Sequence, residues 1–247
     1  MVDIRAVDIN TVTRVMKADN QLPDICDFHA HILPGADHGS QSVKVSLLQL
    51  TLAEKYGVIR VIATPHFYPE REDVASFIER RDRSFDKLID VYDGRIELRR
   101  GAEVLICDGF ERIPMLESLC FSGSNVILVE LPFAELSSSH FYSVKALIEQ
   151  NFNVVIAHAD RYSPKDIDRL IAIGCRIQLN ATSLSRLFID KHIVNWLESK
   201  VVVGIGSDIH QDDKKAYRRF KKALKRIRRY VPYIREESNN IWRCIEK

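Results

Sequence analysis

The 247-residue sequence lacks the features that mark several large classes of protein. It has no run of about 18 apolar residues, so we expect no membrane-spanning helix. Its first segment, MVDIRAVDINTVTRVMKADN, has no uninterrupted apolar core and does not resemble a secretory signal. The five cysteines lie far apart and form no Cys-x-x-Cys pair, which disfavours a disulfide framework and favours a reducing compartment. These absences predict a cytoplasmic protein.

A strong overall charge is also missing. The formal net charge is +2, so the chain as a whole is not a polycation of the nucleic-acid-binding kind. The positive charge gathers in the segment KKAYRRFKKALKRIRRY, whose apolar residues recur every three or four positions and predict a helix over about residues 211–230. We interpret its basic face as solvated, with an anionic membrane or an acidic peptide as alternative partners. We expect no nucleic-acid binding, because no aromatic platform accompanies the charges.

Short runs rich in Val and Ile alternate with longer amphipathic stretches along the chain. The predicted strands are residues 25–31, 58–63, 96–102, 125–131, 153–158, 175–180 and 201–207. One predicted helix begins after residue 41, and the others cover about residues 70–91, 137–150, 164–173 and 183–197. This alternation predicts a parallel barrel of the (β/α) type. The alternative is an open doubly wound sheet, which is weakened because no GxGxxG or GxxxxGK[ST] motif follows a strand.

Most of these strands end in a histidine or a carboxylate. His29 and His31 close the first strand and, being two residues apart in an extended chain, point the same way. The further candidates are Asp37, His66, Glu103, Glu130, His158, Asp208 and His210. Because the carboxyl ends of the strands form the active face of a (β/α) barrel, we expect one cluster there. Imidazole and carboxylate groups without a thiolate suit Mn, Fe or Zn, so the pattern predicts a multinuclear metal site.

Each of these signals is ambiguous when taken alone. A His-x-His pair on a strand is often incidental, and Glu130 in its apolar run could be paired with an arginine instead of a metal. His140 and His192 fall within predicted helices, so we interpret them as surface or structural residues. The joint pattern, not any single motif, carries the prediction.

Six spaced motifs carry a more specific signal. The runs DFHAHILPGADHGS, ATPHFYPE, GAEV, VELPF, AHADRY and GSDIH resemble those of the polymerase-and-histidinol-phosphatase (PHP) superfamily. Within it, the chain is most similar to the manganese-dependent protein-tyrosine phosphatases of bacterial capsule and exopolysaccharide operons. The resemblance implies a distorted (β/α)7 TIM-like barrel, the PHP fold, as a single catalytic domain over residues 25–247. Residues 1–24 would form an N-terminal extension.

The resemblance also implies three divalent metal ions, with Mn first and Fe or Zn as alternatives. The first would be bound by His29, His31, Glu103 and Asp208. The second would be bound by Glu103, Glu130 and His158, and the third by Asp37, His66 and His210.

Three further positions are expected at the substrate. Arg161, in AHADRY, matches the family arginine that contacts the phosphate. His38 stands where the family usually has Asp, and we take it as a candidate catalytic residue. Lys214 and Lys215 stand near the place of a second family arginine, so we predict that they bind substrate, without the bidentate fork of Arg.

The resulting hypothesis is a metal-dependent phosphomonoester hydrolase that acts on phosphotyrosine in a protein, such as the tail of a tyrosine kinase. Peripheral association with a membrane kinase would fit this role. A thiol mechanism is disfavoured, because Ile113 and Val126 stand six positions after Cys107 and Cys120, where a Cys-x5-Arg motif needs Arg. One alternative is a phosphoesterase of the same superfamily acting on histidinol phosphate or a nucleotide. The other is a non-catalytic binding module for a kinase tail.

Overall fold

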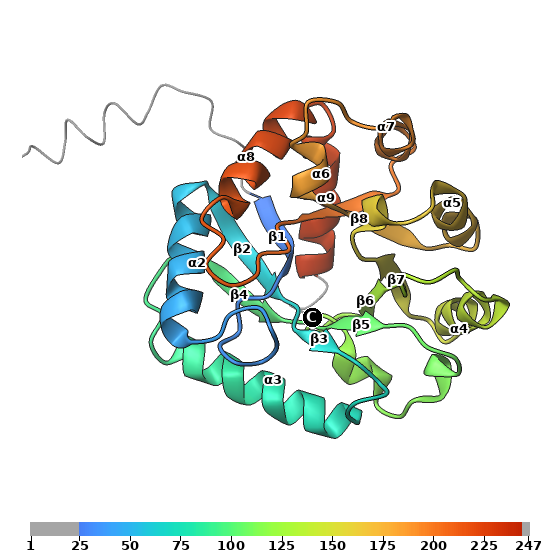
Figure 1. Cartoon of the computed structure of the whole chain (residues 1–247), viewed down its shortest axis with the longest axis horizontal. Helices are drawn as coiled ribbons and strands as arrows, with labels where there is room; N and C mark the ends of the chain where they lie inside the picture. The colour runs from blue at the N-terminus through green and yellow to red at the C-terminus, as the bar shows by residue number, and fades with distance from the viewer. Residues whose placement is uncertain (1–24, 244–247) are drawn as a thin grey trace, which may run out of the picture.

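The structure, a computed structural model, describes residues 25–243. The N-terminal extension predicted over residues 1–24 therefore lies outside the described residues. The described chain is an α/β fold built on one curled sheet of nine strands, all paired in parallel, with helices packed around it (Figure 1). The strand order is β3-β5-β6-β7-β8-β9-β1-β2-β4. The predicted α/β class and parallel sheet are confirmed.

Seven of the strands lie where the Val- and Ile-rich runs predict them. They are β1 (Ile25–Ala30), β2 (Val58–Ala63), β4 (Glu97–Arg100), β6 (Val126–Glu130), β7 (Asn153–Ile156), β8 (Arg176–Asn180) and β9 (Val202–Gly206). The two strands that were not predicted are β3 (His66–Phe67) and β5 (Glu103–Leu105). They are only two and three residues long, so no periodicity reveals them. In the chain, β3 follows closely on β2, and β5 follows closely on the edge strand β4.

The helices largely follow their sequence signals. They are α2 (Val43–Lys55), α3 (Val74–Ile89), α4 (Ser138–Glu149), α5 (Pro164–Ala172), α6 (Ala181–Leu184), α7 (Lys191–Glu198), α8 (Ala216–Arg226) and α9 (Val231–Arg243). Short 3-10 turns cover Phe110–Arg112, Leu116–Leu119 and Ala159–Arg161. Pro164 opens α5, and His140 completes a capping box with Ser137 at the start of α4, which is a structural role.

Two predicted helices differ in their bounds. The helix expected over 183–197 is divided into α6 and α7, because Asp190 takes the extended backbone of an N-cap. The helix expected over about 211–230 begins only at Ala216, since Asp213 binds the backbone N–H groups of Lys215 and Ala216 in a turn. It ends at Arg226, and Pro232, which has no N–H to donate, stands in the first turn of a separate helix, α9. The expected apolar stripe of this segment is nevertheless buried.

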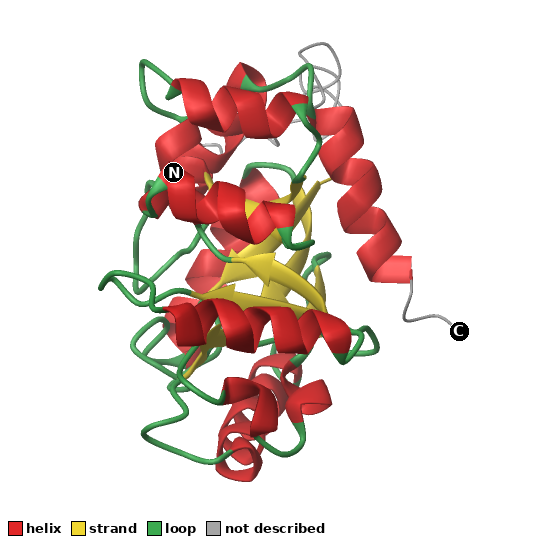
Figure 2. Ribbon diagram, turned by 90° about the vertical axis from the view of Figure 1, so that its right-hand side faces the viewer, coloured by secondary structure: helices red, strands yellow, loops and turns green. Residues whose placement is uncertain are grey.

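The core has two parts. A large cluster lies between the strands and the surrounding helices. A smaller one fills the space near the beginnings of the strands, where Trp242 of α9 packs with Cys26, Phe28 and Val126. Figure 2 shows the strands surrounded by helices, with the helix that leads to the C-terminus on one side of them. No helix within residues 25–243 is both long and apolar enough to cross a membrane.

Candidate metal centre

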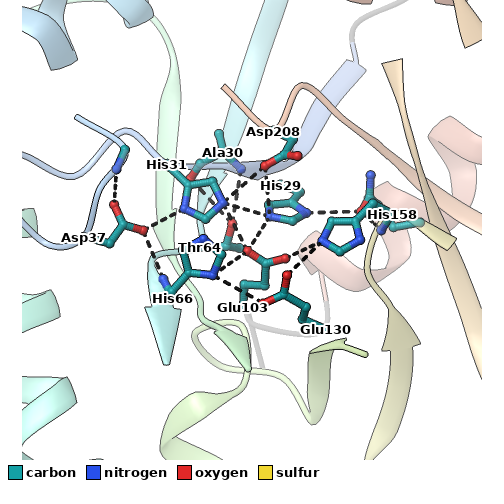
Figure 3. Close-up of polar contacts among 12 residues, drawn as sticks. His29, Ala30, His31, Asp37, Thr64, His66, Glu103, Glu130, His158 and Asp208 are labelled. Atoms are coloured by element: carbon teal, nitrogen blue, oxygen red, sulfur yellow. Dashed lines mark hydrogen bonds and ion pairs between the residues drawn. The ribbon is translucent and has the colours of Figure 1, made fainter. Parts of the chain in front are cut away.

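The candidate ligands come from the carboxyl ends of different strands. His29 belongs to β1, His66 opens β3, Glu103 opens β5 and Glu130 closes β6. The others lie in the loops that follow β1, β7 and β9, and they are His31, Asp37, His158, Asp208 and His210. Figure 3 labels these side chains apart from His210 and shows them pointing toward one another. The structure therefore brings together all nine residues that the sequence analysis singled out.

Glu103 lies at the centre of this cluster and is 1 % exposed. Its Oε2 atom lies 3.1 Å from His29 Nε2, 3.2 Å from His31 Nε2 and 3.0 Å from His66 Nδ1. Its other oxygen, Oε1, lies 2.6 Å from His158 Nε2. One buried carboxylate is thus surrounded by four imidazoles, a convergence of lone-pair donors that is typical of metal sites.

The remaining carboxylates extend the cluster on three sides. Glu130 Oε2 lies 3.6 Å from His66 Nδ1. Asp37 Oδ2 lies 2.7 Å from His31 Nδ1 and accepts a hydrogen bond from the backbone N–H of His66 at 3.0 Å. Asp208 Oδ1 lies 3.4 Å from His31 Nε2 and 3.5 Å from His210 Nδ1. Each candidate ligand is therefore within reach of at least one other.

The cluster fits metal ions. Several of its buried atoms have no hydrogen-bond partner in the part of the chain that the structure describes: Glu103 Oε2, His66 Nδ1, His158 Nδ1 and His210 Nε2. Buried polar atoms are nearly always satisfied, so such orphans gathered in one place call for a cation. Three groups have ligand atoms within 4.8 Å of one another: His31–His66–His210, His29–His31–Glu103 and His66–Glu103–Glu130.

The geometry divides the ligands slightly differently from the family resemblance. The resemblance assigns His31 to the first ion and His66 to the third. In the structure, His31 lies with His29 and Glu103, as the resemblance implies, but it also lies with His66 and His210. His66 lies with Glu103 and Glu130 as well. The two groupings share the same side chains, so the cluster is clear while the assignment of each side chain to one ion stays a prediction.

The electrostatics of the site keep its carboxylates ionised. Burial alone would raise the pKa of Glu103 and of Asp208, but the neighbouring histidines hold the pKa of both carboxyls well below the usual range. Burial alone would lower the pKa of His31, yet Asp208, Asp37 and Glu103 raise it well above the ordinary value. Burial and His31 together lower the pKa of His210 to about 4. His210 is therefore a neutral imidazole, the form that binds metal.

Two candidate ligands sit on strained backbone. His158 has φ 32° and Asp208 has φ 50°, both in the left-handed region that residues with a side chain rarely adopt. His158 stands two residues after the end of β7, and Asp208 stands two residues after the end of β9, where the chain turns into the site. Strain of this kind costs about 1–3 kcal/mol and tends to persist at functional sites. The backbone here is bent so that the side chains face the cluster.

A cavity of about 450 Å³ opens over the cluster. Arg161 lines it and contacts Asp208, with 40 % of its side chain exposed. His38 also lines it, stacked between His66 and His210 with ring centroids 4.8 and 4.7 Å apart. The predicted substrate residues Lys214 and Lys215 are exposed beside α8 and do not line this cavity. Their role stays a prediction.

Two polar residues of β8 were missed in the sequence analysis. Gln178, fully buried, accepts a hydrogen bond from the backbone N–H of His158 at 2.7 Å and lies 3.2 Å from His29 Nδ1. Its Nε2 donates to Asn180 Oδ1 at 3.1 Å, and Asn180 Nδ2 donates to Asp208 at 3.0 Å. β8 thus contributes no candidate ligand, but it orients three of them from three other strands. The available signal was the pair of amides at alternate positions in the buried run RIQLN.

Comparison with known proteins shows the family of the chain. Residues 25–238 match the family model described as "Capsular polysaccharide synthesis, CpsB/CapC". The chain belongs to this CpsB/CapC family. The resemblance drawn from its six motifs is thereby confirmed at the level of the family.

Several CpsB/CapC relatives are named phosphatases. The chain is 25 % identical over 198 residues to the tyrosine-protein phosphatase YwqE of Bacillus subtilis strain 168, covering 74 % of this chain and 76 % of that protein. It is 27 % identical over 199 residues to the putative tyrosine-protein phosphatase CapC of Staphylococcus aureus, covering 74 % and 76 %.

The fold is shared with a solved CpsB/CapC structure. That chain comes from the crystal structures of YwqE from Bacillus subtilis and CpsB from Streptococcus pneumoniae, described as metal-dependent tyrosine phosphatases. The TM-score is 0.73 at 23 % identity, over 90 % of this chain and 94 % of that one. At this identity the likeness establishes the fold.

Proposed function

We propose that the chain is a metal-dependent protein-tyrosine phosphatase, a phosphoric monoester hydrolase linked to capsule or exopolysaccharide synthesis. The observation that carries the proposal is the buried Glu103 carboxylate surrounded by His29, His31, His66 and His158. The family membership supports it, as do relatives that are named tyrosine-protein phosphatases.

We propose that the site binds three divalent metal ions, which are Mn or, as alternatives, Fe or Zn. The ligands would be His29, His31, Asp37, His66, Glu103, Glu130, His158, Asp208 and His210. Such ions lower the pKa of bound water toward ~7 and offset negative charge on phosphoryl oxygens. The low pKa values of Glu103 and Asp208 support this ligand role, because a metal needs the ionised carboxylate.

The residues around the cavity suit an aromatic phosphate. Arg161 is partly exposed at its edge and can present its planar guanidinium to a phosphate in a bidentate manner. Tyr68 stacks on His66 at 5.1 Å, and Phe133, 82 % exposed, also lines the cavity. Two aromatic side chains beside a phosphate site can contact a phenyl ring, which favours a phosphotyrosine substrate over an aliphatic phosphate.

A neighbouring cavity favours a protein substrate. It has a volume of about 530 Å³, shares Tyr68 with the cavity over the cluster, and is lined also by Arg71, Leu105 and Pro132. Residues flanking a phosphotyrosine could lie in it. The proposed partner is therefore a phosphotyrosyl protein such as the tail of a tyrosine kinase. If that kinase is a membrane protein, binding to its tail would bring the chain to the cytoplasmic face of the membrane.

The strand connections support counting the sheet as a distorted (β/α)7 barrel. The N–H of Gly101 donates to the carbonyl of Ala63, and the N–H of Glu103 donates to the carbonyl of Pro65, between the ends of the paired strands. The β2–β4 ladder therefore continues into the β3–β5 ladder. If β2–β3 and β4–β5 are each counted as one bent strand, seven strands surround the site. We propose this count, with one catalytic domain after the N-terminal extension.

The direct test is hydrolysis with controlled metal content. The full chain is stripped with chelator and assayed on p-nitrophenyl phosphate and a phosphotyrosyl peptide, before and after addition of Mn, Fe or Zn. We expect turnover only with a divalent ion. Activity that survives complete metal removal overturns the proposal, and so does full metal loading without turnover, which is the result expected of a non-catalytic binding module.

The substrate class is tested alongside. Histidinol phosphate and a nucleotide monophosphate are assayed under the same conditions, and a larger kcat/KM for either contradicts the tyrosine assignment. Phe133→Ala should raise KM for p-nitrophenyl phosphate more than for an aliphatic phosphate. Tyr142→Ala is the matched control, because Tyr142 is 66 % exposed but does not line the cavity.

A further inference from the structure

We propose that α8 and the α6–α7 loop form a docking face for an anionic lipid bilayer. This basic face consists of the exposed cations Arg218, Lys222, Lys225, Arg226 and Arg228 with the exposed apolar pair Leu187 and Phe188. The inference concerns a surface outside the metal centre and does not rest on the proposed phosphatase activity.

The first support is the one-sided charge of α8. Between Lys214 and Tyr230 the sequence has ten Lys and Arg residues and no Asp or Glu. Tyr217, Phe220 and Leu224 are buried against the barrel, so the apolar side of the helix already has its partner. The cations are left on the outer side, where Arg218, Lys222 and Lys225 follow one another at steps of four and three along one helical face.

The second support is that most of this charge is not neutralised by the protein. Arg219 is paired with Asp213, and Arg229 is paired with Glu198. Among the described residues, Arg218, Lys222 and Lys225 take part in no ion pair. An uncompensated row of cations repels itself and is relieved by an anionic partner, since several kT of potential accumulate at such a surface.

The third support is the apolar pair beside the charges. Leu187 is 74 % exposed and Phe188 is 81 % exposed. Arg226 of α8 donates a hydrogen bond of 2.7 Å to the carbonyl oxygen of Leu187, which fixes the loop against the basic helix. Figure 1 shows the loop running between α6 and α7 on the same side of the molecule as α8. Arg186 and Lys191 flank the pair and are also exposed.

This combination favours a bilayer over an acidic peptide. Charge alone would suit either partner. However, the large apolar side chains of Leu187 and Phe188 are 74 % and 81 % exposed, and an acidic peptide would leave them in water. A bilayer takes up both features, because aromatic and aliphatic tips enter the boundary of the acyl chains while Lys and Arg remain among anionic headgroups.

The test is vesicle flotation with the full chain, without any substrate. Phosphatidylcholine vesicles containing about one third phosphatidylglycerol should bind the protein, and pure phosphatidylcholine vesicles should not. Binding should weaken as NaCl rises from about 0.05 to 0.5 M, because exposed charges are screened. Lys222→Glu with Lys225→Glu, and separately Leu187→Ser with Phe188→Ser, should each lower the partition coefficient by about tenfold.

Matched controls lie on α3 and just after its end, away from this face. Arg83→Glu with Lys87→Glu changes the same charge, and Ile89→Ser with Val91→Ser removes exposed apolar side chains, yet both variants should bind like the parent chain. The melting temperature of every variant shows whether it is folded. Equal binding by all variants, no binding to anionic vesicles, or binding to polyglutamate in place of vesicles each overturns the proposal.

Discussion

The two ends of the space inside the curled sheet are made from the same strands and have opposite characters. Near the strand beginnings, Cys26, Phe28 and Leu128 pack in an apolar cluster closed by Trp242. Near the strand ends, the same β1 and β6 present His29 and Glu130, buried among other ionisable groups. A shift of one to four residues along a strand therefore changes the interior from apolar to ionisable.

The two ends therefore contribute differently to the stability of the fold. Apolar burial contributes roughly 25 cal/mol per Å² without any partner. Buried carboxylates and imidazoles are costly unless a cation or hydrogen bonds compensate them. We therefore expect substitutions at the ionisable end to remove function while the fold persists, and substitutions at the apolar end to do the reverse. The following changes test that contrast.

The largest effect is expected from Asp208→Asn. The variant removes a carboxylate that lies 3.4 Å from His31 Nε2, so metal content should fall and turnover of p-nitrophenyl phosphate should drop by about 1000-fold or more. In chelator its free energy of unfolding should fall, because Asp208 is paired with Arg161 and its low pKa means that the ionised carboxylate stabilises the folded chain, but the variant should remain folded. Parent-like turnover in this variant would contradict the metal role of Asp208.

Trp242→Ala should show the opposite behaviour. Trp242 is 3 % exposed, donates its indole N–H to Glu97 at 3.1 Å and lies under Arg99 at 3.8 Å from the ring centroid. Its removal should lower the free energy of unfolding by about 3–5 kcal/mol in denaturant titrations. Turnover per folded, metal-loaded molecule should remain within about twofold of the parent. A large loss of kcat with little loss of stability would break the contrast.

Asp27, which lies on β1 between Cys26 and Phe28, is a buried carboxyl that should give a pH signature. Burial raises the pKa of Asp27 from its ordinary value of 3.8 to about 6. The folded state therefore holds more protons than the unfolded state between these values, so this residue makes the free energy of unfolding fall as pH rises from about 4 to 6. The full contribution is about 3 kcal/mol at most.

Asp27→Asn isolates this contribution. The amide oxygen can still accept from the backbone N–H of Ser207, as Asp27 Oδ1 does at 2.8 Å. In metal-free protein, the difference in unfolding free energy between variant and parent should grow with pH across this window and then level off. A difference that does not change with pH means that Asp27 titrates normally.

The sequence was informative wherever chemistry or periodicity repeats. Most of the seven predicted strands are buried apolar runs, although β4 is partly exposed. The nine candidate ligands were found because most of the predicted strands end in a histidine or a carboxylate, a joint pattern that no single motif carries. The bends that create β3 and β5 could not be predicted, since they are set by pairing between distant segments such as Gly101 with Ala63.

Other parts of the site depend on proximity that spacing does not encode. Nothing in the sequence says that Phe133 lies at the cavity over His66, or that Lys214 lies away from it. Gln178 was overlooked because an amide is neither a strong metal ligand nor a titratable group. Only its contacts with His29 and His158 in the folded chain show that it supports the ligands.

Gln178→Ala is the smallest and most selective of these tests. Gln178 Oε1 accepts the backbone N–H of His158 and faces His29 Nδ1, so it holds the proton on Nδ1 and leaves Nε2 toward Glu103. Removing such support typically weakens metal affinity by about 10–100-fold. The measurement is metal titration by competition with a chromogenic chelator, with turnover at saturating metal as a second readout.

The control for Gln178 is Gln49→Ala. Gln49 is equally buried and donates to the carbonyl of Gln211 at 2.7 Å, but it contacts none of the nine candidate ligands. Both variants should lose a similar amount of stability, since each deletes one buried amide. Only the change at Gln178 should weaken metal binding, and Gln178→Glu, which keeps the acceptor oxygen, should restore it. If the two alanine variants bind metal equally well, Gln178 belongs with the residues that only stabilise the fold, and the ionisable end is oriented by its ligands alone.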